Sequence, residues 1–104
     1  MQAHGFLMTA VASRADGERI ARALLEQKLA ACVQLLPIDS FYVWQGEQRQ
    51  AGEILLLVKT RTALFERAIA NIKALHPYKT PEIAGLPFSA GFAGYFSWMD
   101  DVTS

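Results

Sequence analysis

The stretch that decides the fold is Glu53-Ile54-Leu55-Leu56-Leu57-Val58-Lys59-Thr60, in a chain of 104 residues. Five consecutive apolar residues stand between charged ones, with no polar residue among them. A strand with one face in water alternates apolar and polar residues, whereas a continuous apolar run indicates a strand that is covered on both faces. The run therefore predicts a strand that needs two layers of cover.

The residues at the start of the chain predict a strand followed by a helix. Residues 5–12 are short and apolar, which is typical of a buried strand. Ser13 with Asp16 three residues on is typical of a capping box, in which Ser13 is the N-cap of the helix. An apolar stripe at helical spacing continues this helix to about Lys28.

A hairpin is predicted between this helix and the decisive run. Residues 30–44 read as one long strand, and Pro37 and Asp39 in its middle predict a bulge or bend. Gln45-Gly46-Glu47 supplies the turn, so the decisive run ends the strand that returns antiparallel to residues 30–44.

The second half of the chain predicts a helix, a strand and a short helical tail. The helix runs from about Thr62, as its N-cap, to Leu75, with apolar residues on one face. Residues 82–88 predict a fourth strand. In residues 92–99 the aromatic residues Tyr95 and Trp98 stand three apart, which predicts one helical turn with both of these rings on one side.

The element order βαββαβ predicts an α+β, ferredoxin-like sandwich, with the short C-terminal helical tail, in a single domain of residues 1–104. Two helices cover one sheet face in that fold, so the second cover of the decisive run must come from other copies of the chain. The apolar fraction of 52% points the same way, because so small a domain has few positions in which to bury it. We therefore predict self-association.

Composition and motifs argue against several classes of protein. The net charge is zero and the ten basic residues form no run, which disfavours nucleic acid as a partner. One cysteine rules out an internal disulfide and favours the cytoplasm, and no apolar run predicts a membrane span or signal peptide. The strand-one motif Cys-x-x-Cys of a copper chaperone and the Gly-x-Ser-x-Gly motif of a hydrolase are both missing. We therefore expect no enzyme.

The segment His76-Pro77-Tyr78-Lys79-Thr80-Pro81-Glu82-Ile83 carries the densest chemistry of the chain. Its two prolines stop the preceding helix and stiffen an extended connection that holds an imidazole, a phenol, an ammonium and a carboxylate. A structural alternative is that His76 and Lys79 only complement the negative end of the helix dipole. The other interpretation is a binding site at this connection.

The sequence resembles the divalent-cation tolerance family, the CutA proteins, from Phe6 to Trp98. The motifs that carry the resemblance occur in the order and spacing of the family. They are Leu29-Ala30-Ala31-Cys32-Val33, Ser40-Phe41-Tyr42-Val43-Trp44-Gln45-Gly46, Glu53 with Val58-Lys59-Thr60, His76-Pro77-Tyr78, Pro81-Glu82-Ile83, and Tyr95 with Trp98.

This resemblance implies a ferredoxin-like subunit in a compact homotrimer, similar in architecture to the nitrogen-regulatory PII proteins. It also implies a role in the tolerance of divalent metals such as copper, without an established catalytic reaction. The chain departs from the family at Gln34, where Asn is frequent. Met8 and Leu75 stand where some members have a thiol and a second imidazole.

For a metal, copper or zinc, the best candidate ligand is His76, because a neutral imidazole is the commonest ligand of transition metals. Three symmetry-related imidazoles, or Glu82, would complete such a site. Met8 is a weaker thioether candidate. Cys32 is another, although in an apolar strand it is expected to pack as a small hydrophobe.

A ligand-binding cleft between subunits is the second hypothesis. Lys59 is predicted to meet Tyr78 or Glu82 across this cleft, because Glu53, although on the same strand face, is about 20 Å away along the strand. The amphipathic aromatics predicted to line the cleft or the subunit interface are Tyr42, Trp44, Tyr95 and Trp98. The alternative function is then a PII-like sensor that binds a small anionic metabolite with Lys59, His76, Tyr78 and Glu82.

Overall fold

The computed structural model describes residues 3–104 and has an α+β architecture. Its antiparallel sheet has the strand order β2-β3-β1-β4, which is the predicted ferredoxin-like arrangement, so the fold class is confirmed. In chain order the elements are β1 (His4–Val11), α1 (Arg14–Glu26), β2 (Cys32–Trp44), β3 (Glu47–Arg61), the 3-10 turn η1 (Thr62–Leu64), α2 (Phe65–Leu75), β4 (Ile83–Pro87) and α3 (Ala93–Val102).

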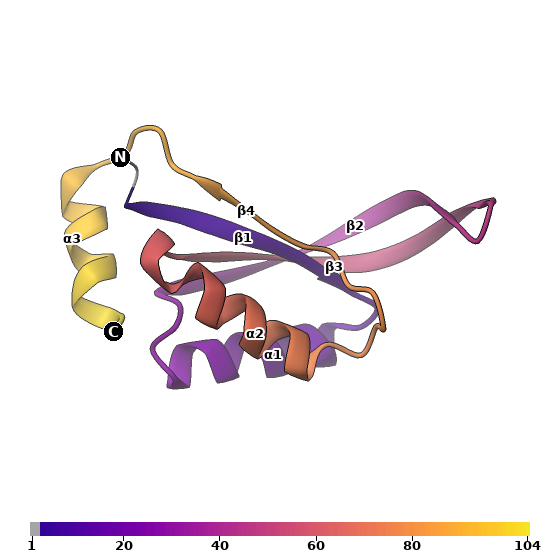
Figure 1. The fold of residues 1–104 in the computed structure, drawn as a ribbon, viewed down its shortest axis with the longest axis horizontal. Helices are drawn as coiled ribbons and strands as arrows, with labels where there is room; N and C mark the ends of the chain where they lie inside the picture. The colour runs from indigo at the N-terminus through magenta and orange to yellow at the C-terminus, as the bar shows by residue number, and fades with distance from the viewer. Residues whose placement is uncertain (1–2) are drawn as a thin grey trace.

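The core lies between the sheet and the two helices α1 and α2, which pack together under one sheet face (Figure 1). Leu56 and Val58 of β3 point into it and are fully buried, as are Ile20 of α1 and Ile72 of α2. The N-cap role of Ser13 at the start of α1 is confirmed, since the Ser13 hydroxyl accepts a hydrogen bond from the Asp16 amide at 3.2 Å.

The opposite sheet face, here called the outer face, lacks a helical layer over its middle. Leu55 and Leu57 alternate with the core residues of β3, so they point to this face, and they are half-buried within one subunit. Leu36, the cross-strand neighbour of Leu55, is 42% exposed. The decisive apolar run thus has one face in the core and one face that the subunit covers only in part.

The hairpin of β2 and β3 continues past the rest of the sheet as a two-stranded arm, residues 38–53. Strand β1 pairs with β3 from Ile54 to Arg61, so beyond Ile54 the two arm strands pair only with each other. Figure 1 shows the arm leaving one end of the molecule. Its tip is a two-residue turn in which Gln45 and Gly46 both have positive φ, at 53° and 78°, as type I′ hairpin turns require.

Of the two alternatives predicted at Pro37 and Asp39, a bulge or a bend, the bulge is wrong. The pairing of β2 with β3 runs without interruption from Cys32 opposite Lys59 to Trp44 opposite Glu47. Strand β2 pairs with β3 alone and is therefore an edge strand. An edge strand accommodates a proline, since some of its amide groups need no partner in the ladder.

Two helix boundaries differ from the prediction. Thr62 opens a 3-10 turn, and the N-cap of α2 is Leu64, which makes no side-chain capping bond. The tail forms a ten-residue helix, α3, where a single turn was predicted. The predicted placement of its two rings is confirmed, because Tyr95 and Trp98 stack with centroids 5.9 Å apart.

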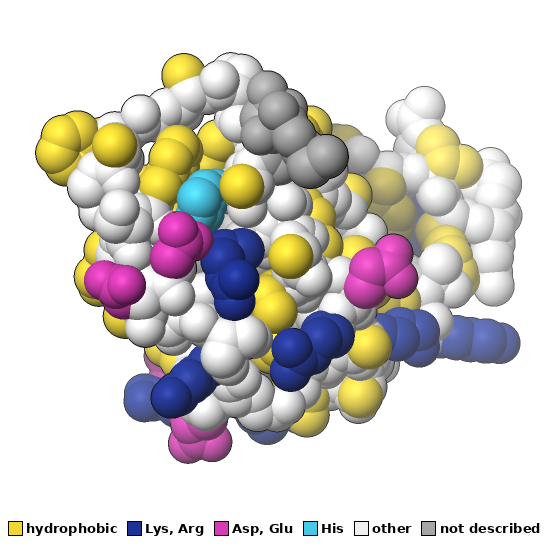
Figure 2. Space-filling model, turned by 60° about the vertical axis from the view of Figure 1, so that its left-hand side comes forward, with side chains coloured by type: hydrophobic (Ala, Val, Ile, Leu, Met, Phe, Trp, Pro, Cys, Tyr) yellow, Lys and Arg dark blue, Asp and Glu magenta, His cyan; other side chains and the backbone are white. Residues whose placement is uncertain are grey.

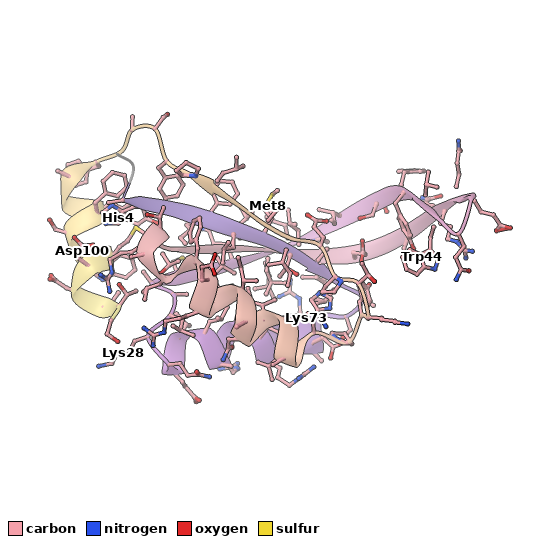
Figure 3. The ribbon with its side chains drawn as sticks, viewed as in Figure 1. His4, Met8, Lys28, Trp44, Lys73 and Asp100 are labelled. Carbon is pink, nitrogen blue, oxygen red and sulfur yellow. The ribbon has the colours of Figure 1, made fainter. Side chains whose placement is uncertain are left out.

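Helix α3 is held across the end of the sheet that lies opposite the arm (Figure 1). His4 of β1 and Asp100 of α3 lie side by side, with Nε2 and Oδ1 2.7 Å apart (Figure 3). The His4 ring also stacks on Phe96, with centroids 4.5 Å apart. At the end of the helix, Arg61 donates to the Thr103 hydroxyl at 2.9 Å.

The surface at the α3 end of the molecule has charges of both signs. Figure 2 shows Lys and Arg side chains on this face interspersed with Asp and Glu side chains and with apolar patches. Within residues 3–104, no helix combines the length and the apolar character needed to span a membrane.

A side chain at position 5 should destabilise the fold. A Cβ on Gly5 would overlap the carbonyl oxygen of Leu86 on β4 and lie 3.0 Å from the Phe65 ring. We expect Gly5→Ala to lower the free energy of unfolding by about 1–3 kcal/mol, the usual cost of overpacking. Urea denaturation at equal protein concentration measures it. Gly52→Ala is the matched control, since a Cβ there meets no atom within 4 Å, and equal stability of the two variants would contradict this prediction.

Candidate functional site

The link between α2 and β4, residues 76–82, crosses the sheet end from which the arm leaves. His76 is the C-cap of α2 and has extended backbone angles, φ −72° and ψ 132°, as expected for a residue that precedes proline. The predicted stop of the helix at Leu75 is therefore confirmed.

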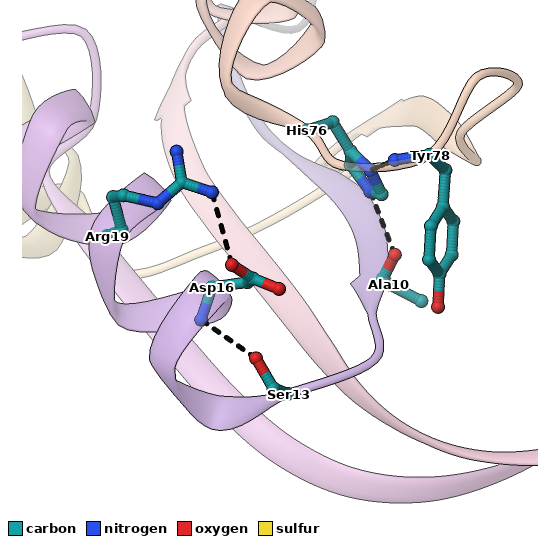
Figure 4. A network of polar contacts seen from close by, with 6 residues as sticks. All are labelled: Ala10, Ser13, Asp16, Arg19, His76 and Tyr78. Carbon is teal, nitrogen blue, oxygen red and sulfur yellow. Dashed lines mark hydrogen bonds and ion pairs between the residues drawn. The ribbon is translucent and has the colours of Figure 1, made fainter.

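His76 is held by hydrogen bonds on both ring nitrogens (Figure 4). Nδ1 accepts from the Tyr78 amide at 3.1 Å, and Nε2 lies 2.9 Å from the carbonyl oxygen of Ala10 on β1. Since Nδ1 acts as an acceptor, Nε2 carries the proton of the neutral ring and donates to Ala10. The side chain is only 8% exposed. This geometry fixes the link to the end of β1.

Tyr78 connects the link to the base of the arm. Its hydroxyl donates to Oε2 of Glu53 at 2.7 Å, and its ring lies 4.9 Å from the His76 ring, centroid to centroid. Burial, followed by the hydrogen bond to Glu53 and the negative charge of that carboxylate, raises the pKa of Tyr78 to about 12. The Tyr78 hydroxyl therefore keeps its proton at neutral pH and is the donor in the hydrogen bond to Glu53.

A cleft of about 500 Å³ lies between the link and the arm. The arm contributes three aromatic residues, Phe41, Tyr42 and Trp44, and Tyr78 adds a fourth from the link. Two carboxylates, Glu53 and Glu82, also line it, and the remaining lining residues, Ala10, Ser40 and Thr80, are small. Among the described residues, none of those that line the cleft is a lysine or an arginine. The cleft is thus aromatic and negatively charged.

The structure brings four of the predicted cleft residues together and leaves others apart. The cleft is lined by Tyr42, Trp44, Tyr78 and Glu82. His76 is not part of this lining, and its ring holds the link to β1 by hydrogen bonds. Lys59 is absent from this lining, because it pairs with Phe6 and Cys32 towards the other end of the sheet.

Trp98 is also remote from this cleft in the subunit. It lies on α3 and stacks on Tyr95. Burial raises the pKa of Tyr95, and an electrostatic contribution from Cys32 adds to that rise. Tyr95 therefore lies near the Cys32 end of β2. The arm, by contrast, carries Trp44 at the far end of the molecule (Figure 3).

Glu53 is the cleft residue that the sequence analysis did not include among the ligand-binding residues. Strands β1 and β3 are antiparallel, with Val11 beside Ile54, and α2 runs back along β3, so the link arrives at the Glu53 end of that strand. The chain topology therefore brings Tyr78 to Glu53 within the subunit. A contact of Lys59 with Tyr78 or Glu82 of another subunit stays a prediction.

The predicted metal ligands do not converge in one subunit. Met8 pairs with Leu57 and Ala84 in the middle of the sheet, and Cys32 lies opposite Lys59. Within residues 3–104, no group of three His, Cys, Asp or Glu side chains is placed to hold a metal ion. Metal binding by His76 stays a prediction, and it would require one of the two ring hydrogen bonds to break.

Comparison with known proteins gives consistent matches over nearly the whole chain. The family model described as CutA1 divalent ion tolerance protein matches residues 6–102. A divalent-cation tolerance protein CutA from Thermus thermophilus is 44% identical over 98 residues, which are 93% of this chain and 95% of the relative. One from Archaeoglobus fulgidus is 41% identical over 98 residues, which are 94% of this chain and 96% of the relative.

Solved structures agree with these sequence matches. The structure described as the periplasmic divalent cation tolerance protein CutA from Archaeoglobus fulgidus superposes on this chain with a TM-score of 0.93. It is 40% identical, and the match covers 95% of this chain and 97% of that one.

Removal of the charge of Glu53 should move the titration of Tyr78. Folding raises this pKa above its ordinary value of 10.0. The neutral Tyr78 phenol therefore contributes fully to the stability of the fold below pH 10.0, and this contribution is lost as the pH rises through about 12. We expect Glu53→Gln to lower the pKa of Tyr78 towards 10.0, as followed by the ultraviolet absorbance of tyrosinate. Tyr78→Phe identifies which titration step belongs to this residue. A step that stays in place in Glu53→Gln would show that the carboxylate has no part in the shift.

Proposed function

The chain belongs to the CutA1 divalent ion tolerance family, and we propose that it acts as a homotrimeric divalent-cation tolerance protein that binds metal ions of the copper type. The observation that carries this proposal is the pair of carboxylates, Glu53 and Glu82, that face one cleft without a lysine or arginine in its described lining. Such a cleft attracts cations, and at a given set of ligands Cu²⁺ binds most tightly among the divalent first-row metals.

The residues of the cleft fit weak and exchangeable binding. Two carboxylates and a phenol from one subunit are fewer donors than the four that a structural zinc site uses. Glu82 is exposed, and within residues 3–104 its carboxylate has no hydrogen bond or ion pair, so it is available to an ion. This donor set therefore suits an ion that binds and leaves readily. The proposal contains no catalytic step.

The homotrimer is supported by the two surfaces that one subunit leaves uncovered. The outer sheet face exposes Leu36 and Leu86, and the arm exposes Phe41 and Val43 at 74% and 69%. An isolated two-stranded hairpin is at best marginally stable in water, so an arm of this length is expected to rest on another chain. Our proposed location is the cytoplasm, supported by the single cysteine.

Metal binding should depend on the carboxylates of the cleft. In titration calorimetry of metal-stripped protein with Cu²⁺ and Zn²⁺, we expect Glu82→Gln to weaken the affinity by about tenfold, which corresponds to about 1.4 kcal/mol. Glu26→Gln, an exposed carboxylate at the end of α1, is the control and should bind as the original protein does. His76→Gln tests the imidazole separately. Equal affinities in the Glu82 and Glu26 variants would remove the cleft from the proposal.

The proposed trimer predicts the molar mass of the protein in solution. We expect light scattering to give about three times the subunit mass of 11.5 kDa. Phe41→Asp places a charge on the exposed arm and should shift the population towards monomer, because burial of that charge in an interface is costly. Glu47→Gln, also on the arm, should leave the mass unchanged. A monomeric original protein would contradict the proposed assembly.

A further inference from the structure

The cleft between the link and the arm is larger and more aromatic than a metal ion requires. Its volume of about 500 Å³ falls in the range of small-molecule sites, which is roughly 300–1,000 Å³. Within one subunit, Tyr42 and Trp44 are each 44% exposed and line it, so this subunit leaves ring surface open to a ligand. A site for an ion alone would offer oxygen, nitrogen or sulfur donors in place of these rings.

The charges around the cleft select the sign of a ligand. Glu53 uses one carboxylate oxygen, Oε2, to accept from Tyr78, and Glu82 has no polar partner within residues 3–104. Arg49 lies opposite Tyr42 in the ladder, but its guanidinium is paired with Glu47 at 3.5 Å and donates to the carbonyl oxygen of Trp44 at 3.3 Å. Neither Arg49 nor the exposed Lys79 of the link lines the cleft. An anion would therefore meet two carboxylates and no lining cation.

Aromatic rings and carboxylates together recognise organic cations. The face of a tryptophan or tyrosine ring attracts an ammonium or guanidinium group, and the apolar body of the same ligand gains from burial against the ring. A free carboxylate next to the rings adds a charge-assisted hydrogen bond. This combination is less suited to a neutral apolar molecule or an anion.

We propose that the cleft binds a small organic cation, an amine or a guanidine with an apolar body, whose charged head lies between Glu53 and Glu82 and whose body packs on Tyr42 and Trp44. The inference shares its carboxylates with the proposed metal binding but does not depend on it. The ligand charge differs from that of the anionic metabolite in the sequence-based alternative, because Lys59 is absent from the lining that this subunit supplies.

Three probes with the same ring separate charge from hydrophobic contact. Calorimetry on the metal-stripped protein compares benzylammonium, benzyl alcohol and benzoate. We expect benzylammonium to bind at least about tenfold more tightly than benzyl alcohol, and benzoate to bind most weakly. Equal affinities for the three probes, tighter binding of benzoate, or no binding of benzylammonium to folded protein would overturn the proposal.

Variants assign the binding to this cleft. Glu82→Gln should weaken benzylammonium by about tenfold, whereas Glu47→Gln, an arm carboxylate outside the lining, should not. Circular dichroism and light scattering confirm that each variant keeps its fold and mass. The same loss in both variants would show that general surface charge, and not the cleft, holds the probe.

Trp44→Leu distinguishes the two uses of the carboxylates. Tryptophan is no metal ligand, so this variant should lose affinity for benzylammonium by about tenfold and keep its heat of metal binding. If the original protein binds no metal, the benzylammonium titration still tests the organic-cation site. If it binds no benzylammonium, the metal titration still tests the proposed metal binding. An unchanged affinity of Trp44→Leu for benzylammonium would refute the aromatic half of the site.

Discussion

One constraint governs this molecule: its sheet is apolar on both faces, and the chain supplies two helices for only one of them. Leu56 and Val58 are sealed under α1 and α2, whereas Leu55 and Leu57 alternate with them and face outward. Helix α3 packs across the end of the sheet, where the contact between His4 and Asp100 holds it, and does not cover the middle of the outer face. The middle of the outer face and the arm therefore remain for contacts that one subunit cannot make.

The arm and the link are coupled by one hydrogen bond. The Tyr78 hydroxyl reaches Glu53 at 2.7 Å at the place where the arm leaves the sheet, and His76 secures the other side of the link on β1. Tyr78 and Glu53 thus both line the cleft and join the link to the base of the arm. In the proposed trimer, ligand binding and subunit contact would act on shared residues, so each would influence the other.

Much of the fold could be predicted from the sequence, since the apolar run of β3, the Ser13 cap and the prolines of the link each act locally. A bulge or bend was predicted from Pro37 and Asp39, but an edge strand tolerates proline without a break in register. The site was harder. Within one subunit, Tyr42, Trp44, Tyr78 and Glu82 line one cleft, whereas Lys59 lies towards the other end of β3, so the predicted site between subunits stays a prediction.

The start of β1 and the end of α3 lie together at the end of the molecule opposite the arm (Figure 1). Tags, fluorophores or surface tethers fused at that end would therefore project away from the link, and they would leave both the arm and the concavity beside it unobstructed. Immobilised protein should then present the arm and the cleft to the solution, whether the tether is attached before β1 or after α3.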